Sequence, residues 1–307
     1  MKTVFFGTPE WAVPSLDALL DSDIEVAAVV TNPDRPAGRG MEMKPSPVKL
    51  RAVEAELEIL QPERARDPAL EDRVAEIAPD IAVVVAYGKI LPGPLLEVPP
   101  LGFINVHFSL LPAYRGAAPV QRAIIDGLTE TGVSIIVLTE GMDEGPVITR
   151  EPVAIDETDT AGSLGARFAD VGAGILVQAL QGYAEGTMPP KPQDHDRATY
   201  ASKISTEQAR IQWTLRPQDI RNLVRGLNPV PGAWTVVRGR RLKVHEAAVV
   251  PAKTPFEPGV LQTTDRLVVG AADGAVELTD VQLEGKRRMS GEELARGLRP
   301  APGERFQ

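Results

Sequence analysis

The chain has 307 residues, of which 43% are hydrophobic, and its formal net charge is −9. It has no cysteine, which excludes disulfides, thiolate nucleophiles and cysteine-ligated zinc, and its three histidines lack metal-ligand spacing, so no metal is expected. The sequence shows neither a run of about 18 apolar residues nor a signal peptide, which predicts an intracellular, cytoplasmic protein with no membrane partner.

The amino-terminal residues predict an α/β domain. Residues 1–7 and 24–31 are apolar runs typical of buried strands, and the apolar residues between 11 and 20 have helical spacing. Gly7 follows the first run, but the segment lacks the further glycines of the dinucleotide-binding fingerprint. Pro9 also removes a backbone amide that would bind phosphate, so we expect no nicotinamide or flavin cofactor.

Two regions that follow carry candidate functional side chains. Residues 32–47 are rich in Pro and Gly and lack periodicity, which indicates either an exposed surface loop or a functional one. Residues 70–77 have helical spacing, and residues 81–87 form a wholly apolar strand before Gly88. Tyr87 at the end of this strand either borders a crevice or is a core aromatic residue with its hydroxyl at the rim.

Residues 102–119 carry the strongest chemical signal. Side chains two apart on a strand point to the same side, so Asn105 and His107 emerge together from an alternating apolar run. The chain then turns through Gly116 and resumes with helical spacing from Pro119. Because open α/β sheets bind ligands at the carboxyl ends of their strands, this stretch predicts a site with an amide donor beside a proton carrier.

A second candidate side chain lies in a glycine-rich turn. Residues 132–139 predict another strand, and the turn that follows, 140–145, has two glycines that bracket Asp143. Such a turn can aim a carboxylate into a site through unusual backbone angles, but Asp in a glycine-rich turn is also common turn chemistry. Residues 145–155 then predict one or two strands, and residues 161–183 predict a long helix.

The carboxyl-terminal part predicts a separate small β domain. Three prolines in residues 187–205 indicate an extended linker, which divides a first domain, 1–186, from a second, 206–307. After a helix expected at 217–227, five short apolar stretches with Gly or Pro turns predict an OB-like barrel of the kind that binds oligonucleotides. The predicted strands are residues 233–237, 242–250, 259–263, 266–271 and 275–283.

Charge is divided unevenly between these domains. From Glu207 onward there are 16 Lys and Arg against 12 Asp and Glu, a balance of +4, which leaves 17 against 30, or −13, for residues 1–206. A cluster of four basic residues lies on one predicted hairpin: Arg238, Arg240, Arg241 and Lys243. The cluster is either a solvated turn or a track for nucleic-acid phosphates, and the acidity of the first domain favours the track.

In these motifs the chain resembles the folate-dependent formyltransferases, and Ser109–Pro119 is most similar to members that act on methionyl-tRNA. Further matches in the same order are Phe5–Pro9, Asp34–Gly40, Pro45–Pro47, Ala86–Pro92, Met142–Gly145 and Asn228–Trp234. The resemblance implies a Rossmann-like formyltransferase domain with a mainly parallel sheet, followed by an OB-like domain that binds tRNA. It also implies formyl transfer from 10-formyltetrahydrofolate to the α-amino group of initiator methionyl-tRNA, for translation initiation. We expect a monomer.

The resemblance assigns roles to individual residues. Asn105, His107 and Asp143 match the family's catalytic trio, as oxyanion donor, proton carrier and orienting carboxylate. The residues predicted to bind folate are Ser109, Leu110, Leu111, Pro112, Tyr87 and Gly88. The residues predicted to bind tRNA are Arg39, Lys44, Arg238, Arg240, Arg241 and Lys243.

The sequence departs from the family pattern in two places. Met41 and Glu42 stand where the family often has a pair of lysines, which leaves Arg39 and Lys44 to supply the charge of their loop. Ala113 stands where the family often has a basic residue. This second departure removes one side-chain contact but leaves the catalytic trio complete.

Other functions share some of these features. Enzymes that formylate amino-sugar nucleotides have similar domains, but the Arg39 loop, the Asn228–Trp234 motif and the basic carboxyl-terminal part favour tRNA as the acceptor. Glycinamide ribonucleotide formyltransferases lack a second domain of this size. A catalytically inactive tRNA-binding protein is disfavoured because all three residues of the trio are present.

Overall fold

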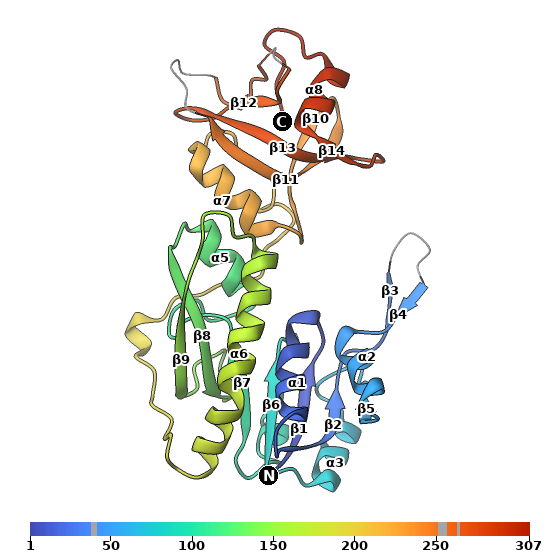
Figure 1. The fold of residues 1–307 in the computed structure, drawn as a ribbon, viewed down its shortest axis with the longest axis vertical. Helices are drawn as coiled ribbons and strands as arrows, with labels where there is room; N and C mark the ends of the chain where they lie inside the picture. The colour runs from blue at the N-terminus through green and yellow to red at the C-terminus, as the bar shows by residue number, and fades with distance from the viewer. Residues whose placement is uncertain (38–41, 251–256, 263–264) are drawn as a thin grey trace. The chain divides into compact units, whose positions relative to one another are not determined.

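The computed structural model describes residues 1–37, 42–250, 257–262 and 265–307, which form two compact units (Figure 1). The first unit consists of Met1–Pro119, Glu130–Ala154 and Gly165–Ser202. The second unit consists of Val120–Thr129, Ile155–Leu164 and Lys203–Gln307. Within the described ranges, no helix combines the length and the apolar character needed to cross a membrane.

A seven-stranded sheet forms the centre of the first unit, in the order β5-β2-β1-β6-β7-β8-β9. The strands are β1 (Lys2–Gly7), β2 (Glu25–Val30), β5 (Glu58–Leu60), β6 (Ile81–Val85), β7 (Phe103–His107), β8 (Glu130–Val137) and β9 (Val147–Ala154). The pairings from β5 to β7 are parallel, and β8 and β9 add antiparallel pairings at one edge. This confirms the α/β domain expected from the buried apolar runs and the mainly parallel sheet that the resemblance implied.

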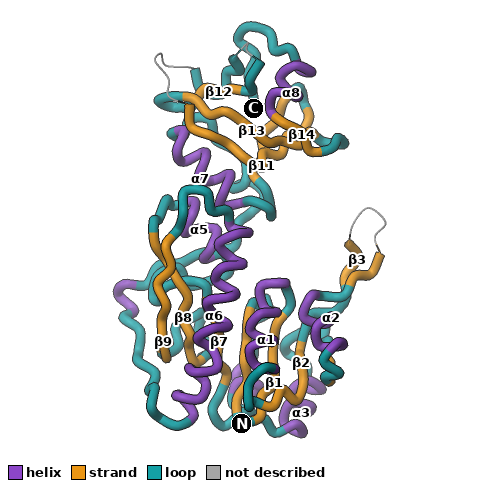
Figure 2. The backbone as a smooth tube through the Cα atoms, in the orientation of Figure 1, coloured by secondary structure: helices purple, strands orange, loops and turns teal. Residues whose placement is uncertain are grey.

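Helices accompany this sheet, as the tube in Figure 2 shows. They are α1 (Val13–Leu20), α2 (Pro47–Glu54), α3 (Pro68–Ile77), α4 (Gly93–Leu96) and the part of α6 (Ala161–Ala184) from Gly165 onward. Helix α5 (Pro119–Ile125) belongs to the second unit from Val120 onward. Local sequence explains where they begin. The Asp67 side chain, for example, accepts a hydrogen bond of 3.1 Å from Ala69 N, and Pro68 fills the first position of α3.

Several short elements of the first unit, among them helix α4, were not expected from the sequence. Residues 32–47 contain a two-stranded hairpin, β3 (Arg35–Ala37) with β4 (Glu42–Lys44), instead of a loop throughout. Strand β5 and helix α2 were also missed, because β5 has three residues and α2 carries a mixed rather than a clearly periodic sequence. The strand expected at 132–139 begins and ends two residues earlier, as β8.

The second unit is built on an antiparallel sheet in the order β10-β11-β13-β12, with β14 paired to β13. Its elements are α7 (Pro217–Leu227), β10 (Ala233–Val237), β11 (Arg240–Val250), β12 (Val268–Gly270), β13 (Ala275–Leu283), β14 (Arg288–Ser290) and α8 (Gly291–Leu298). No pairing between β10 and β12 closes the sheet over the described residues. This partly open small sheet is consistent with the expected OB-like architecture.

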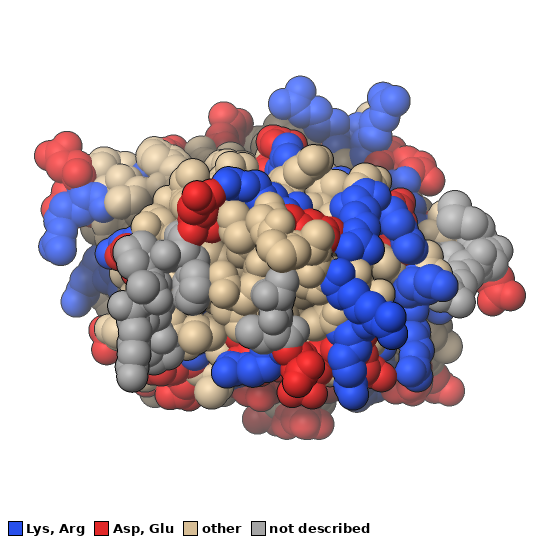
Figure 3. Space-filling model, turned by 90° about the horizontal axis from the view of Figure 1, so that it is seen from above, with Lys and Arg blue, Asp and Glu red and all other residues tan. Residues whose placement is uncertain are grey.

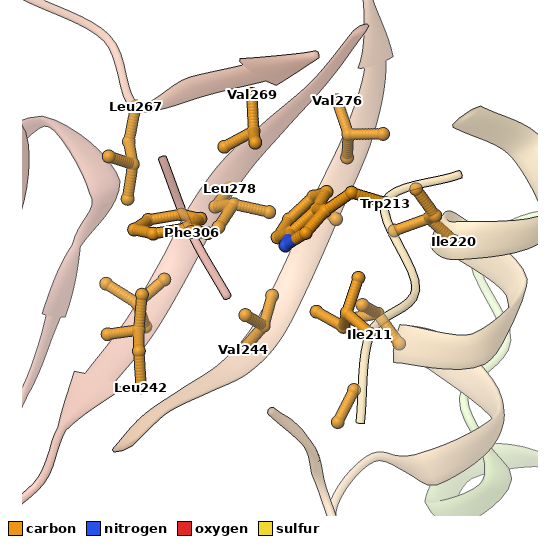
Figure 4. Packing of buried hydrophobic residues seen from close by; sticks show 14 of the residues in the cluster. Ile211, Trp213, Ile220, Leu242, Val244, Leu267, Val269, Val276, Leu278 and Phe306 are labelled. Atoms are coloured by element: carbon orange, nitrogen blue, oxygen red, sulfur yellow. The ribbon is translucent and has the colours of Figure 1, made fainter. Parts of the chain in front are cut away.

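The strand expected at 259–263 is wrong over its described residues, which form only isolated bridges, Val260 with Arg305 and Leu261 with Val269. The core of this unit lies between the sheet and the flanking helix α7 (Figure 4). Trp213 packs against Phe306 there, with ring centroids 5.6 Å apart. The small sheet therefore owes its stability to apolar side chains from both ends of the unit's sequence.

Candidate active site and basic hairpin

Asn105 and His107 lie two residues apart on β7, which pairs in parallel with β6 and antiparallel with β8. Strand alternation therefore places their side chains on the same side of the sheet. His107 is buried, with 5% of its surface exposed, whereas Asn105 is half-buried. No hydrogen bond joins the Asn105 side chain to any residue that the structure describes, so its amide is available to a ligand.

The imidazole of His107 is held between a carbonyl and a carboxylate. Its Nε2 lies 3.0 Å from the carbonyl oxygen of Tyr114. Because a carbonyl can only accept a hydrogen bond, Nε2 carries a proton. Its Nδ1 lies 3.6 Å from Asp143 Oδ1. Nδ1 is therefore the nitrogen that can gain or release a proton, and it faces a carboxylate.

The backbone aims Asp143 at His107. Asp143 has a left-handed conformation, with φ of 51°, in the turn between β8 and β9. Its Oδ2 accepts a hydrogen bond of 2.8 Å from Gly116 N, which leaves Oδ1 toward the imidazole. The carboxylate of Asp143 is mostly buried, with 16% of the side chain exposed. Two segments distant in sequence thus converge on His107.

Gly145 fixes the turn that carries Asp143. A Cβ atom at this position would lie 1.8 Å from the carbonyl oxygen of Val137, which is a backbone atom of β8. We therefore expect Gly145→Ala to displace the turn, at a cost of about 1–3 kcal/mol in the free energy of unfolding. We also expect kcat to fall more than KM rises, because Asp143 moves with the turn. Thermal unfolding and steady-state kinetics measure the two effects.

Gly174 supplies the matched control. It lies on α6, is exposed, and has no atom within 4 Å of the position that a Cβ would take. Gly174→Ala should leave kcat unchanged and stabilise the helix by up to about 1 kcal/mol. An unchanged kcat in Gly145→Ala would show that the turn does not position the carboxylate.

The loop after β7 is fixed by buried contacts. Ser109 is fully buried, and its Oγ donates a hydrogen bond of 2.6 Å to the carbonyl oxygen of Ala113. Leu111 is 2% exposed and packs against Ile136 and Val147. The Ser109 hydroxyl is therefore engaged in holding its own loop.

A cavity of about 420 Å³ borders this loop. Its lining includes the predicted folate-binding residues Leu110, Leu111 and Pro112. The remaining lining residues are Ala113, Arg150, Pro192, Asp194 and Arg197. Tyr87 and Gly88 do not line it. The six residues predicted to bind folate therefore do not surround one cavity.

Tyr87 belongs to the core of the first unit. It is 1% exposed, and its ring meets Phe6 edge-on, with centroids 5.5 Å apart. Burial raises the pKa of the Tyr87 hydroxyl to about 12, so the group stays neutral. Gly88, in contrast, is exposed, has φ of 78°, and has open space where a Cβ would stand. Of these two neighbours, Gly88 alone offers surface to a ligand.

The basic residues of the β10–β11 hairpin differ in how their charges are engaged. Arg238 forms two hydrogen bonds to the Glu304 carboxylate, at 2.7 and 2.9 Å, and thereby holds the pKa of Glu304 below its usual range. Arg240 donates to the carbonyl oxygen of Glu284. Arg241 and Lys243 are exposed and form no salt bridge to a described residue, and the one hydrogen bond of the Lys243 ammonium, to the carbonyl oxygen of Pro231, is long at 3.4 Å. These last two charges are the ones most available to phosphate.

Trp234 adds an aromatic ring to this surface. The guanidinium carbon of Arg241 lies 4.1 Å from its ring centroid, and that of Arg210 lies 5.6 Å away. The register of β10 and β11 pairs Trp234 with Lys243. Figure 3 shows Lys and Arg gathered in a band on one face of the molecule, with Asp and Glu among them. Sequence reasoning missed Arg210, because nothing before the strands marks it as a neighbour of Trp234.

The predicted tRNA loop is described only in part. Arg39 lies outside the described residues. Lys44 is exposed on β4, where it pairs with Arg35 across the hairpin. The hairpin therefore presents two basic residues at its base.

Residues 1–180 match the family described as Formyl transferase, and residues 203–299 match the one described as Formyl transferase, C-terminal domain. The methionyl-tRNA formyltransferase of Streptomyces griseus subsp. griseus is 49% identical over 306 residues, covering 99% of this chain and 99% of that protein.

Among solved structures, methionyl-tRNA formyltransferase from Clostridium thermocellum has a TM-score of 0.60 and 18% identity, covering 82% of this chain and 95% of its own. An N-formyltransferase from Helicobacter canadensis, in complex with folinic acid and dTDP-3-aminofucose, has a TM-score of 0.67 and 18% identity, covering 91% and 98%. These two likenesses establish the fold alone. Both domain matches and the near-complete relative together show that the chain belongs to the formyl transferase family, in the group of the methionyl-tRNA formyltransferases.

Proposed function

We propose that this chain transfers a formyl group from 10-formyltetrahydrofolate to the α-amino group of methionine on initiator tRNA, in the cytoplasm, for translation initiation. The observation that carries the proposal is the pairing of His107 with Asp143 on the side of β7 that also bears Asn105. The acceptor is inferred from the name of the relative from Streptomyces griseus, which matches over nearly the whole chain.

Asn105 is suited to stabilise the charge that develops in this reaction. Attack of an amine on a formyl carbon places negative charge on the formyl oxygen, and a preorganised hydrogen-bond donor lowers that barrier. The amide of Asn105 is half-buried and makes no hydrogen bond to another described residue. It can therefore donate to the oxyanion without changing its own protonation state.

His107 and Asp143 provide the route for protons. The amino group of methionine must lose a proton in order to attack, and the leaving nitrogen of the donor must gain one. The Nδ1 atom of His107 is the ring position free to carry that proton, and Asp143 Oδ1 lies 3.6 Å from it. The carboxylate also gives the protonated ring a counter-charge in a mostly buried setting.

The predicted folate-binding residues divide into two kinds. Gly88, Leu110 and Pro112 have accessible surface, and we propose that they contact the donor. Ser109, Leu111 and Tyr87 are buried, so we propose that they support the two loops from within. A tetrahydrofolate analogue should protect the backbone amide of Gly88 from hydrogen exchange if this division is right.

We propose that Arg241 and Lys243 bind tRNA phosphates. Replacing both with alanine is expected to weaken tRNA binding and to reduce the slope of log affinity against log salt by about 1 for each phosphate that the variant no longer neutralises. The KM for the folate donor should stay the same. Binding of methionyl-tRNA at several salt concentrations measures the slope.

Arg216→Ala is the matched control for the hairpin, since it removes one positive charge from the second unit. Arg216 is engaged by Asp219 through two hydrogen bonds of 2.8 Å. Its loss should leave the salt slope unchanged. If the slope of log affinity against log salt were the same in the control and in the double variant, Arg241 and Lys243 would not contact tRNA phosphates directly.

A direct comparison of acceptors tests the function as a whole. Purified protein is supplied with 10-formyltetrahydrofolate and either initiator methionyl-tRNA or an amino-sugar nucleotide, and formylated product is quantified. We expect product with the tRNA. Product with the amino-sugar nucleotide alone would overturn the proposed acceptor and leave the formyl transfer chemistry intact.

A further inference from the structure

A buried guanidinium lies beside the proposed active site. Arg115 is 2% exposed, yet it forms no salt bridge with a described carboxylate. Its Nε and Nη2 both donate to Gln193 Oε1, at 3.1 and 2.8 Å, and Nη2 lies 3.4 Å from His195 Nδ1. Because burying a charge without a counter-ion is costly, the arrangement points to a role other than stability.

Gln193 links this guanidinium to the turn that carries Asp143. It is 5% exposed, and its Nε2 donates to the carbonyl oxygens of Asp143 and Gly145, at 2.8 and 2.7 Å. The orientation of the amide is fixed, since Arg115 can only donate and the two carbonyls can only accept. All the hydrogen-bonding positions of this side chain are therefore used within the protein.

The backbone on either side of Arg115 touches the proposed catalytic pair. The carbonyl oxygen of Tyr114 accepts from His107 Nε2, and Gly116 N donates to Asp143 Oδ2. Tyr114 and Gly116, the two neighbours of Arg115, thus contact the imidazole and the carboxylate respectively, while the Arg115 side chain reaches the same turn through Gln193.

Residues 191–201, which we call the strap, form backbone hydrogen bonds to the 114–116 segment and to β9. Thr199 O accepts from Arg115 N at 2.8 Å, and Ala201 N donates to Arg115 O at 2.7 Å. At its other end, Lys191 exchanges two backbone hydrogen bonds of 2.8 Å with Val147 on β9. The strap therefore joins the 114–116 segment to the strand that follows the Asp143 turn.

We infer that Gln193 and Arg115 are positioning residues, which hold the Asp143 carboxylate against His107 without touching substrate. This inference rests on the proposed catalytic role of Asp143. Its distinguishing consequence is a loss in kcat with no change in KM for either substrate, because neither residue is assigned to a binding surface.

The first test replaces Gln193 in the full-length chain. Gln193→Leu removes every hydrogen bond of the amide, and we expect kcat for formylation of methionyl-tRNA to fall about 10- to 100-fold, the effect of misplacing a catalytic group by about 1 Å. Gln218→Leu is the matched control, since it removes a glutamine hydrogen bond of 3.0 Å to Asn222 in the second unit. An unchanged kcat in a folded Gln193→Leu protein would overturn the inference.

Gln193→Glu separates positioning from simple neutralisation of Arg115. The carboxylate can still accept from the guanidinium, but it cannot donate to the two carbonyls of the turn. We expect kcat to stay low although the buried charge is now compensated. Wild-type kcat in this variant would mean that Gln193 serves Arg115 alone, which overturns the inference without relying on the leucine variant.

A double variant tests whether Gln193 acts through Asp143. In an Asp143→Asn background, Gln193→Leu should cause no further loss of kcat, because groups that act as one unit are not additive. A second loss as large as the first would show that Gln193 acts independently of Asp143. Full activity in Asp143→Asn alone would instead remove the catalytic role of Asp143, and the positioning role with it.

Discussion

Replacing Asn105 with alanine is expected to lower kcat for formyl transfer by roughly 10²–10³-fold, the cost of losing one oxyanion donor. Because the amide makes no hydrogen bond to another described residue, its removal breaks no hydrogen bond within that part of the protein. The melting temperature should therefore change little. Single-turnover formylation of methionyl-tRNA, with both substrates saturating, measures the chemical step directly.

Asn105→Asp is the companion variant, because it keeps the shape of the side chain and replaces the donor with a carboxylate. A carboxylate that faces a developing oxyanion repels it, so this variant should be at least as slow as the alanine variant. A folded Asn105→Asp protein with wild-type turnover would remove Asn105 from the reaction.

Replacing His107 with glutamine is expected to lower kcat by roughly 10²–10⁴-fold, the usual contribution of general acid–base transfer. Glutamine retains an amide donor for the carbonyl oxygen of Tyr114, which the Nε2 of His107 contacts at 3.0 Å. It has no group that can exchange a proton at the position of Nδ1. The variant therefore separates the structural hydrogen bond from the proton transfer, and rapid-quench kinetics measures the remaining rate.

His107→Ala provides the contrast, since it loses both functions and leaves a cavity at a buried site. Its melting temperature should fall below that of the glutamine variant, while the two should have similar kcat values. If His107→Gln turned over at the wild-type rate and His107→Ala did not, the role of His107 would be to hold the loop rather than to move a proton.

The placement of Asn105 and His107 follows largely from local sequence. Alternation in β7 was enough to put Asn105 and His107 on one side of a strand, because the period of two is a property of the extended backbone. The glycines around Asp143 located a turn, and Gly145 proves to have no room for a side chain. What alternation could not give is the distance between His107 and Asp143, which depends on how two strands and their loops pack.

Other features of the structure could not be predicted because no local sequence pattern specifies them. Tyr87 ends an apolar strand, and nothing local tells whether its ring turns into the core or toward a crevice. The capping box of Ser290 and Glu293 marks the start of helix α8, but the helix has only eight residues, too few for a clear periodic pattern. Gln193 lies in a stretch rich in proline, where a hydrogen bond to a distant carbonyl produces no periodic pattern. Such contacts are specified by tertiary structure alone.

The strap has a consequence for dissecting this enzyme into fragments. A truncation after residue 186, or one at the end of the first family match at residue 180, would remove Gln193 and Thr199 although both belong to the first compact unit. The Asp143 turn would then lack its outer support, and an inactive fragment would falsely suggest that the second unit takes part in catalysis. A fragment that ends at Ser202 keeps the strap whole and is the proper piece for asking what the amino-terminal part achieves alone.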